Sequence, residues 1–335
     1  MKIGMICRMD NSGLGTMSWE YARHLKPHKI LLIDAGRGPT FPERYEDFNI
    51  RIVTGMLDIQ DISWLLDDID IFFTIETPYN WKFVTQARAK GVKSVLYTMY
   101  EMSPPKLPAE FDYYLCPSEL DKRYFPLRST IIKPPVALDR LKYEKRTIAT
   151  TFIHTASHGG VSGRKGTQLF LDAIPLVKNP NAKFKIFTWK PFTSNDPRVT
   201  IEVVNFKNYW QAWREGDVLV YPQDYNGMCL PIQEAMASGL AVISTDIFPF
   251  NTFLHKDLLF KPESMYKTRC APSLNETDAA KITPESIAEK IDSICGKDIS
   301  EYSLHGLKWS EQNSWDKLYE EYENHFLSLV QEREI

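Results

Sequence analysis

The sequence lacks the features that mark membrane-spanning and disulfide-stabilised proteins. It contains no run of about 18 apolar residues, the length that a membrane-spanning helix requires. No basic leader with an apolar core precedes the first strand-like residues, so we expect a cytoplasmic protein, or one in peripheral contact with a membrane. The cysteines form no CxxC pair, which indicates reduced thiols. They are Cys7, Cys116, Cys229, Cys270 and Cys295.

An excess of positive charge is also missing. The formal net charge is -3, so the composition gives no support to nucleic-acid binding or to attraction by a strongly anionic membrane. The hydrophobic share of 43% is typical of a globular protein, and 335 residues exceed one comfortable core. We therefore expect two domains.

Complete phosphate-binding and metal-binding motifs are missing as well. No full GxGxxG or Walker sequence occurs. The DxD at residues 68–70 leads directly into an apolar strand, which favours a solvated turn over a metal site. His24 and His28 have the i, i+4 spacing of metal ligands, but a proline interrupts them. A strand-to-loop junction separates His154 from His158. We therefore expect no metal site.

Short apolar runs alternate with amphipathic stretches along the chain, a pattern typical of βα units around a mostly parallel sheet. Each predicted strand of the first half ends in polar or glycine residues, so we expect its loops to gather at the carboxyl edge. These strands are predicted at residues 2–8, 29–34, 50–55, 69–76, 93–101 and 112–118, with helices at 16–25 and 80–91.

The alternation begins again after residues 131–147, which combine adjacent prolines with charges as a linker does. Strands are then predicted at residues 149–157, 182–190, 199–205, 217–223, 240–246 and 257–262, with helices after Gly166 and at 209–216 and 231–239. A helix rich in aromatic residues is predicted from Trp309 to about Leu329. We expect α/β domains at residues 1–140 and 141–308, followed by a C-terminal helix at 309–335.

Two parallel sheets joined by a linker place two carboxyl edges across a cleft, where open α/β folds bind ligands. The first candidate loop at such an edge is residues 10–16. There Gly13 and Gly15 let backbone N–H groups approach an anion at a helix N-terminus. The alternative is a tight turn in which Thr16 is an ordinary N-cap.

The second candidate loop, residues 158–167, lies between a strand and a helix and is rich in glycine. Its adjacent cations Arg164 and Lys165 could neutralise a diphosphate around which the loop wraps. The alternative interpretation is a flexible, solvated turn.

The third candidate is the segment YNGMCLPIQEAMASGLAVIST, residues 225–245, which passes from a polar turn through a helix into a strand. Pro231 fits the first helical turn, where its missing N–H costs nothing. Residues 227–229 then present backbone at the helix entrance. Glu234, placed in the first turn, could bind two vicinal hydroxyls, as a ribose offers. Alternatively, Glu234 complements the helix dipole.

Two acids, Glu76 and Glu101, follow apolar strands of the first half. A merely solvent-exposed role explains poorly why an acid follows an apolar strand. Partial burial would raise the pKa of such a carboxyl toward the range useful for acid–base chemistry. The alternative is that each carboxylate caps amides of a neighbouring loop.

These motifs resemble the GT-B glycosyltransferases of the large retaining group, the glycosyltransferase family 4-like or group 1 enzymes. Residues 226–243, NGMCLPIQEAMASGLAVI, closely follow the family segment G-x-x-L-P-x-x-E-A-M-A-x-G-x-P-V-I. Residues 164–166 resemble its basic loop, the glycines of residues 13–15 its N-terminal glycine loop, and residues 116–118 the Pro-Ser that ends a first-domain strand. The order of the motifs agrees, and almost the whole chain takes part.

The resemblance implies two Rossmann-like domains, a C-terminal helix that crosses back to the first, and transfer of a hexosyl or pentosyl group with retention. The donor would be a UDP- or GDP-sugar, with no metal and no other cofactor. Glu101 or Glu76 would orient the acceptor or the sugar, and Arg164 and Lys165 would stabilise the leaving diphosphate. The resemblance assigns donor binding to Gly13, Gly15, Arg164, Lys165, Asn226, Gly227, Met228, Cys229, Leu230 and Glu234.

Asn226 stands where the family has its first acid, which leaves the identity of the sugar open. Asn226 also leaves a second class of function open, namely a catalytically silent protein that binds nucleotide sugars. A nucleotide-sugar epimerase and a phage-type DNA-base glycosyltransferase are further alternatives. The acceptor is open among saccharides, lipids, proteins and modified DNA bases, and residues 78–81, 103–108 and 263–283 are candidates for binding it.

Overall fold

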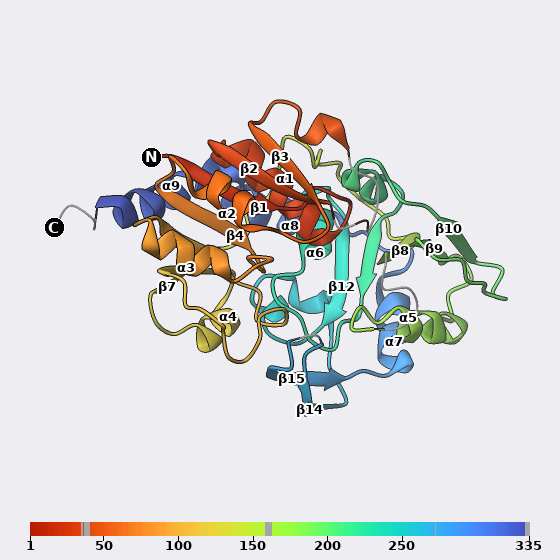
Figure 1. Ribbon diagram of the computed structural model, residues 1–335. Coiled ribbons are helices and arrows are strands. Elements are labelled where there is room, and N and C mark those ends of the chain that lie inside the picture. The colour runs from red at the N-terminus through yellow and green to blue at the C-terminus, as the bar shows by residue number, and fades with distance from the viewer. Residues whose placement is uncertain (35, 37–40, 158–162, 272, 332–335) are drawn as a thin grey trace. The chain divides into compact units, whose positions relative to one another are not determined.

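The computed structural model describes residues 1–34, 36, 41–157, 163–271 and 273–331. The chain forms two compact units, and both are built from more than one segment (Figure 1). Unit 1 comprises Met1–Pro135, Arg269–Asn275 and Trp315–Ile335, and unit 2 comprises Val136–Thr268 and Glu276–Ser314.

Within the described residues, unit 1 is built around a seven-stranded parallel sheet of order β3-β2-β1-β4-β5-β6-β7. All residues of the central strand β4, IFFTI, are buried, as expected for a parallel strand covered on both faces. The strands are β1 (Ile3–Cys7), β2 (Lys29–Asp34), β3 (Ile50–Thr54), β4 (Ile71–Ile75), β5 (Lys93–Tyr97), β6 (Tyr113–Cys116) and β7 (Ser129–Ile131). The helices are α1 (Gly13–Leu25), α2 (Ile59–Leu66), α3 (Lys82–Ala89), α4 (Glu119–Tyr124) and α9 (Trp315–Gln331), with a 3-10 turn at Pro42–Arg44.

The described part of unit 2 contains a six-stranded parallel sheet of order β10-β9-β8-β11-β12-β13 and a separate two-stranded sheet of β14 and β15. The strands are β8 (Thr151–Ser157), β9 (Lys183–Thr188), β10 (Val199–Val203), β11 (Val218–Tyr221), β12 (Ala241–Thr245), β13 (Leu259–Phe260), β14 (Ser264–Arg269) and β15 (Glu276–Lys281). The helices are α5 (Thr167–Ala173), α6 (Leu230–Ala237), α7 (Pro284–Ile294) and α8 (Ser300–Gln312).

The C-terminal helix α9 lies against α1 and completes the core of unit 1 (Figure 1). The Tyr21 ring meets the rings of Trp315 and Tyr322 edge-on, at centroid distances of 5.0 and 5.5 Å. The hydroxyl oxygens of Tyr21 and Tyr322 are 2.6 Å apart, and the Tyr322 hydroxyl donates to the carbonyl of Lys133 over 3.0 Å. The last helix of the chain is therefore part of the first unit's interior.

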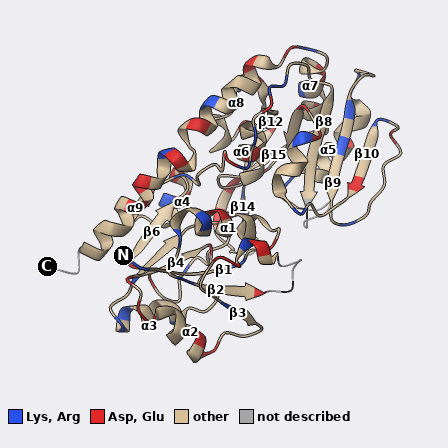
Figure 2. Ribbon diagram, turned by 90° about the horizontal axis from the view of Figure 1, so that it is seen from above, with Lys and Arg blue, Asp and Glu red and all other residues tan. Residues whose placement is uncertain are grey.

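Helix α9 is amphipathic, with one buried stripe that includes Trp315, Tyr322 and Phe326. Figure 2 shows charges of both signs on α8 and α9, in line with the small net charge of the chain. Among the helices of the described residues, none has both the length and the apolar character that crossing a bilayer would require.

The predicted α/β architecture of two parallel sheets is confirmed, but several local predictions are wrong. The helix expected from Trp309 to about Leu329 is two helices, α8 and α9. Asn313, at the end of α8, has φ -118° and ψ 24°, and its side chain donates to the carbonyl of Trp309 over 2.7 Å. This local hydrogen bond competes with continuation of the helix.

Other differences concern short elements. The helix predicted at 209–216 is a short 3-10 helix, Tyr209–Arg214, and strand β5 ends at Tyr97 rather than continuing to residue 101. The insert at 263–283 contains the strands β14 and β15. Helices α2, α4 and α7 were not predicted.

Candidate functional site

The turn at residues 163–166 in unit 2 lies between β8 and the start of α5. The first part of the predicted glycine loop, residues 158–162, falls outside the described residues. Gly166 has φ +70°, and a Cβ atom there would lie 1.9 Å from the carbonyl oxygen of Pro222. Only glycine fits this close approach, which packs the turn against the end of β11.

His154, on β8, holds the start of α5 in place. Its ring is fully buried, with Nδ1 2.8 Å from the carbonyl oxygen of Val220 and Nε2 2.8 Å from the hydroxyl of Thr167. A carbonyl only accepts, so Nδ1 carries the proton and Nε2 accepts from Thr167. Burial lowers the pKa of His154 to about 4. The i, i+4 spacing of His154 and His158 suggested only a metal ligand, so this structural role was not predicted.

The cations of this turn, Arg164 and Lys165, interact electrostatically with the start of α6. Burial lowers the pKa of Lys165 to about 8, an effect that Cys229 opposes and the charge of Arg164 strengthens. Burial also raises the pKa of the Cys229 thiol to about 12, although both cations act against this rise. The guanidinium of Arg164 lies 5.9 Å from the ring centre of Tyr225. Positive charge therefore gathers beside the 225–229 turn.

Helix α6 begins as predicted, at Leu230, with Pro231 in its first turn and Cys229 as N-cap. One prediction about it is wrong. Glu234 is the fifth helical residue, so the first turn contains no acid. Because a helix dipole acts mainly on the first turn, dipole compensation explains Glu234 poorly. Glu234 is partly buried and acts electrostatically on the buried Tyr221 at the end of β11.

The turn before α6 is fixed by side-chain hydrogen bonds. The amide of Asn226 donates to the side-chain oxygen of Gln223, and Gln223 donates to the Cys229 sulfur over 3.4 Å. The hydroxyl of Thr245 donates to the backbone carbonyl of Gln223 over 2.7 Å. Gly227 and Met228 are buried within this turn. The amide of Asn226 thus gives the turn a hydrogen-bond donor that a carboxylate would not supply.

The 10–16 loop of unit 1 is stabilised from within. Asp10 accepts from the backbone N–H of Ser12 over 2.9 Å, and Ser12 accepts from the N–H of Gly15 over 3.1 Å. Ser12 is therefore the N-cap of α1, and the alternative interpretation, in which Thr16 is the N-cap, is wrong. A Cβ at Gly15 would lie 2.3 Å from the Asp10 carbonyl oxygen, whereas one at Gly13 would meet no atom within 4 Å. Packing alone thus accounts for Gly15, and donor binding by this loop stays a prediction.

An unpredicted arginine also supports this loop. Arg44 is buried and donates to the backbone carbonyls of Met9 and Asp10 over 3.0 and 2.9 Å. Its guanidinium lies 4.7 Å from the ring centre of Trp19 on α1. The sequence signal was weak, because Arg44 is more than 30 residues away from the backbone that it holds.

The two acids of unit 1 occupy different environments. Glu76 directly follows β4, is partly buried, and has φ +64°, with its N–H donating to the Tyr97 carbonyl over 3.0 Å. Glu101 does not stand at a strand end as expected, because it lies four residues beyond the end of β5, in a turn. Its side chain is only 3% exposed. A second buried acid acts on it, Asp121 of α4, which the sequence analysis missed.

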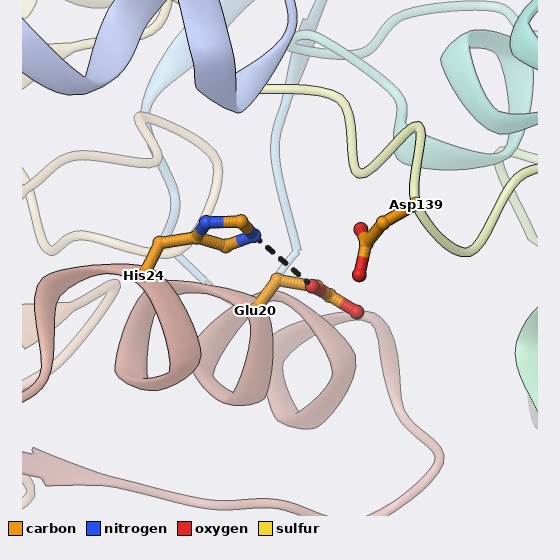
Figure 3. Close-up of side chains that lie close together, drawn as sticks. All are labelled: Glu20, His24 and Asp139. Atoms are coloured by element: carbon orange, nitrogen blue, oxygen red, sulfur yellow. Dashed lines mark ion pairs between the residues drawn. The ribbon is translucent and has the colours of Figure 1, made fainter.

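The histidine and DxD motifs have separate partners. In Figure 3 the ring of His24 points toward Glu20, with 3.9 Å between Nε2 and Oε2, and it also stacks on Trp315 at 4.3 Å. His28 instead lies 3.7 Å from Asp68, which forms a 2.7 Å ion pair with Lys2. The two histidines therefore do not share a partner.

Comparison with known proteins identifies the fold. Residues 151–267 match the family model described as Glycosyl transferases group 1. Similar solved structures include Anabaena HepE in complex with UDP, with a TM-score of 0.70 and 11% identity over 98% of this chain and 100% of that chain. A glycosyltransferase from Rickettsia africae has a TM-score of 0.68 and 13% identity over 98% of each chain. Sucrose-phosphate synthase from Thermosynechococcus elongatus has a TM-score of 0.68 and 12% identity over 99% of each chain.

The protein has the GT-B glycosyltransferase fold. The GT-B fold that the sequence resemblance implied is confirmed, and the family match runs from β8 into β14, so it includes the 163–166 turn and α6. At 10–13% identity the solved structures establish the fold alone. No curated protein sequence matches the chain.

Proposed function

We propose that this protein is a cytoplasmic glycosyltransferase that moves a sugar from a nucleotide-diphosphate sugar to an acceptor hydroxyl. One observation carries the proposal: Arg164 and Lys165 gather beside the N-terminus of α6, inside the segment that matches the glycosyltransferase family. Anabaena HepE has been crystallised with UDP and with UDP-glucose, which supports a UDP-sugar as the first donor to test.

Unit 2 supplies the groups that a diphosphate donor needs. A departing nucleotide diphosphate gains negative charge, and preorganised cations stabilise that charge more in the transition state than in the ground state. Arg164 and Lys165 would provide this stabilising positive charge, assisted by the positive end of the α6 dipole. The backbone of residues 227–230 would bind the donor, and the carboxylate of Glu234 would accept from the two ribose hydroxyls.

The proposed reaction retains the anomeric configuration and uses no metal. The acceptor hydroxyl approaches from the face on which the diphosphate leaves, and Glu101 or Glu76 orients the acceptor or the sugar. Because two protein cations neutralise the leaving group, no divalent ion is required for that task. Retention is checked by following the anomeric proton of the product with NMR.

The test begins with the thermal unfolding of the full chain in the presence of UDP, GDP, ADP, CMP and TDP and their common sugars, with and without EDTA. We expect UDP to raise the unfolding temperature equally with and without EDTA. We then expect UDP release from UDP-glucose when a hydroxyl acceptor is present. Lys165→Ala and Glu234→Ala should each weaken UDP binding about tenfold or more. The control is Lys183→Ala, which removes an exposed lysine of the same unit.

The outcomes separate the competing functions. A silent nucleotide-sugar-binding protein binds UDP-glucose without releasing UDP to any acceptor. An epimerase converts the nucleotide sugar in the absence of an acceptor. Unchanged UDP affinity in both Lys165→Ala and Glu234→Ala would remove the proposed donor site.

A further inference from the structure

The turn that carries Glu101 is fixed although it lies beyond the end of β5. The backbone N–H groups of Met102 and Ser103 both donate to the carbonyl of Met99, over 2.9 and 3.0 Å. Glu101 stands in the middle of this turn, nearly fully buried. The residues on both sides of it are held by side chains from two distant segments of unit 1.

Asp121 of α4 holds the turn at its beginning. Its carboxylate is fully buried and accepts from the backbone N–H of Tyr100 over 2.8 Å. The same carboxylate accepts from the hydroxyls of Thr98 and Ser118, over 3.4 and 3.2 Å. The residue directly before Glu101 is thus fixed through its N–H.

Asn275 holds the same turn through its carbonyl groups. Asn275 is 6% exposed, and its side-chain nitrogen donates to the backbone carbonyls of Tyr100 and Ser103 over 2.5 and 2.9 Å. The backbone of Asn275 is itself fixed. Its backbone carbonyl accepts from the N–H of Cys270 over 2.9 Å, and its backbone N–H donates to the hydroxyl of Ser273 over 3.2 Å. Aspartate at this position would have the same shape and no N–H to donate.

The placement of Asn275 in the chain is unusual. Segment Arg269–Asn275 packs with unit 1, although the residues on either side of it belong to unit 2. Its two hydrogen bonds to the Glu101 turn span 175 and 172 residues of sequence. This arrangement places a primary amide, with both of its N–H groups used, against the turn that carries Glu101, one of the two proposed acceptor-orienting acids.

We propose that Asn275 and Asp121 are positioning residues that clamp the turn around Glu101 and so preset the direction of its carboxylate. The backbone around Glu101 has little conformational freedom. The N–H and carbonyl of Tyr100 and the carbonyl of Ser103 all form hydrogen bonds with the side chains of Asp121 or Asn275. Such preorganisation preserves the geometry of a reacting complex, where an error of about 1 Å can cost about 100-fold in rate. This inference rests on the proposed role of Glu101 in glycosyl transfer.

Electrostatics supports the same arrangement. Burial, together with the nearby charge of Glu101, raises the pKa of Asp121 well above its usual value. Asp121→Asn therefore makes an informative variant, since it keeps an oxygen that accepts from Tyr100 and removes the ionisable group. Asp121→Ala removes both.

The test is a double-mutant cycle between Asn275→Ala and Glu101→Gln in the full chain, read by UDP release from UDP-glucose. We expect Asn275→Ala to lower kcat about 10- to 100-fold with less than about a twofold change in KM for the donor. Added to Glu101→Gln, the same change should cause no further loss of kcat, because it acts through Glu101. Asp121→Asn should retain more activity than Asp121→Ala.

A measurement without substrate accompanies the cycle. Amide hydrogen exchange of residues 98–104 should quicken in Asn275→Ala and stay unchanged in Asn49→Ala, which removes an exposed asparagine of unit 1 that also donates to a backbone carbonyl. Unchanged exchange in Asn275→Ala would overturn the clamp whatever the activity. An equal loss of kcat with and without Glu101→Gln would overturn the positioning role and leave the transferase standing. Absence of UDP release by the wild-type chain would overturn both the positioning role and the proposed transferase activity.

Discussion

The chemistry of Lys165 depends strongly on its surroundings. Burial brings its pKa down to about 8, so at neutral pH it keeps its proton with little margin. The adjacent Arg164 strengthens this effect, and a bound diphosphate would reverse it by favouring the charged form. A lysine in this position is therefore a cation whose charge in the free protein depends on pH near neutrality.

This environment predicts a pH-dependent affinity for UDP. Binding favours protonated Lys165, so affinity should be full below its pKa and fall as pH rises through about 8, by at most about tenfold per pH unit. Lys165→Arg should keep its affinity between pH 7 and 9, because a guanidinium stays charged. Isothermal titration calorimetry at pH 7, 8 and 9 checks both proteins. A parallel decline in the arginine variant would assign the effect to another group.

At the scale of elements, the contact of α1 with α9 shows how a helix from the end of the chain joins the first unit. The hydroxyl of Tyr322 contacts the Tyr21 hydroxyl and the Lys133 carbonyl inside a buried aromatic cluster. Tyr322→Phe leaves the packing in place and withdraws one hydrogen-bonding group from both partners. A buried polar group that loses its partner costs more than the average hydrogen bond contributes.

We therefore expect Tyr322→Phe to lower the free energy of unfolding by about 1–3 kcal/mol. Tyr319→Phe is the matched control, because it removes a hydroxyl from the same helix at a side chain that is 38% exposed. The control should change stability by less than about 0.5 kcal/mol. Urea unfolding, with the slope of the transition unchanged, measures both variants. Equal effects would show that the hydrogen bonds to α1 and Lys133 do not stabilise the unit.

The elements predicted well from the sequence are those whose residue pattern is local and long enough to be recognised. The buried strands β4 and β11 are nearly continuous apolar runs, and α6 carries proline in its first turn. Helix α4 has 6 residues, which is too short for a clear helical period. Helix α2 did carry a usable signal, the capping box of Asp58 and Asp61.

The same distinction holds for the candidate site. Gly166, Lys165 and the entrance of α6 belong to strand–loop–helix segments whose residues are neighbours in sequence, so their grouping could be predicted. Asp121 and Asn275 reach the Glu101 turn over 21 and 175 residues. Periodicity carries no information about such contacts, and the extended-looking sequence after Tyr97 misled the strand assignment because those contacts bend it into a turn.

At the scale of the whole molecule, the family match and most of the proposed donor groups lie in unit 2, between residues 151 and 267, while Gly13 and Gly15 lie in unit 1. Unit 1 contains the buried acids and the clamp on Glu101. The division suggests that donor binding is a property of the second unit, to which the first adds acceptor chemistry. Such a division makes a prediction for the full chain that requires no knowledge of the acceptor.

We expect UDP to slow amide hydrogen exchange in unit 2, at residues 163–173 and 226–237, because a ligand that binds only the native state suppresses its local opening. Helices α2 and α3 of unit 1 serve as internal controls and should exchange at the same rate with and without UDP. Mass spectrometry of the full chain at saturating UDP measures all of these peptides together. Lys165→Ala should lose the protection at the same UDP concentration. Protection confined to residues 10–16 would move the donor site to the first unit, and with it the assignment of Lys165.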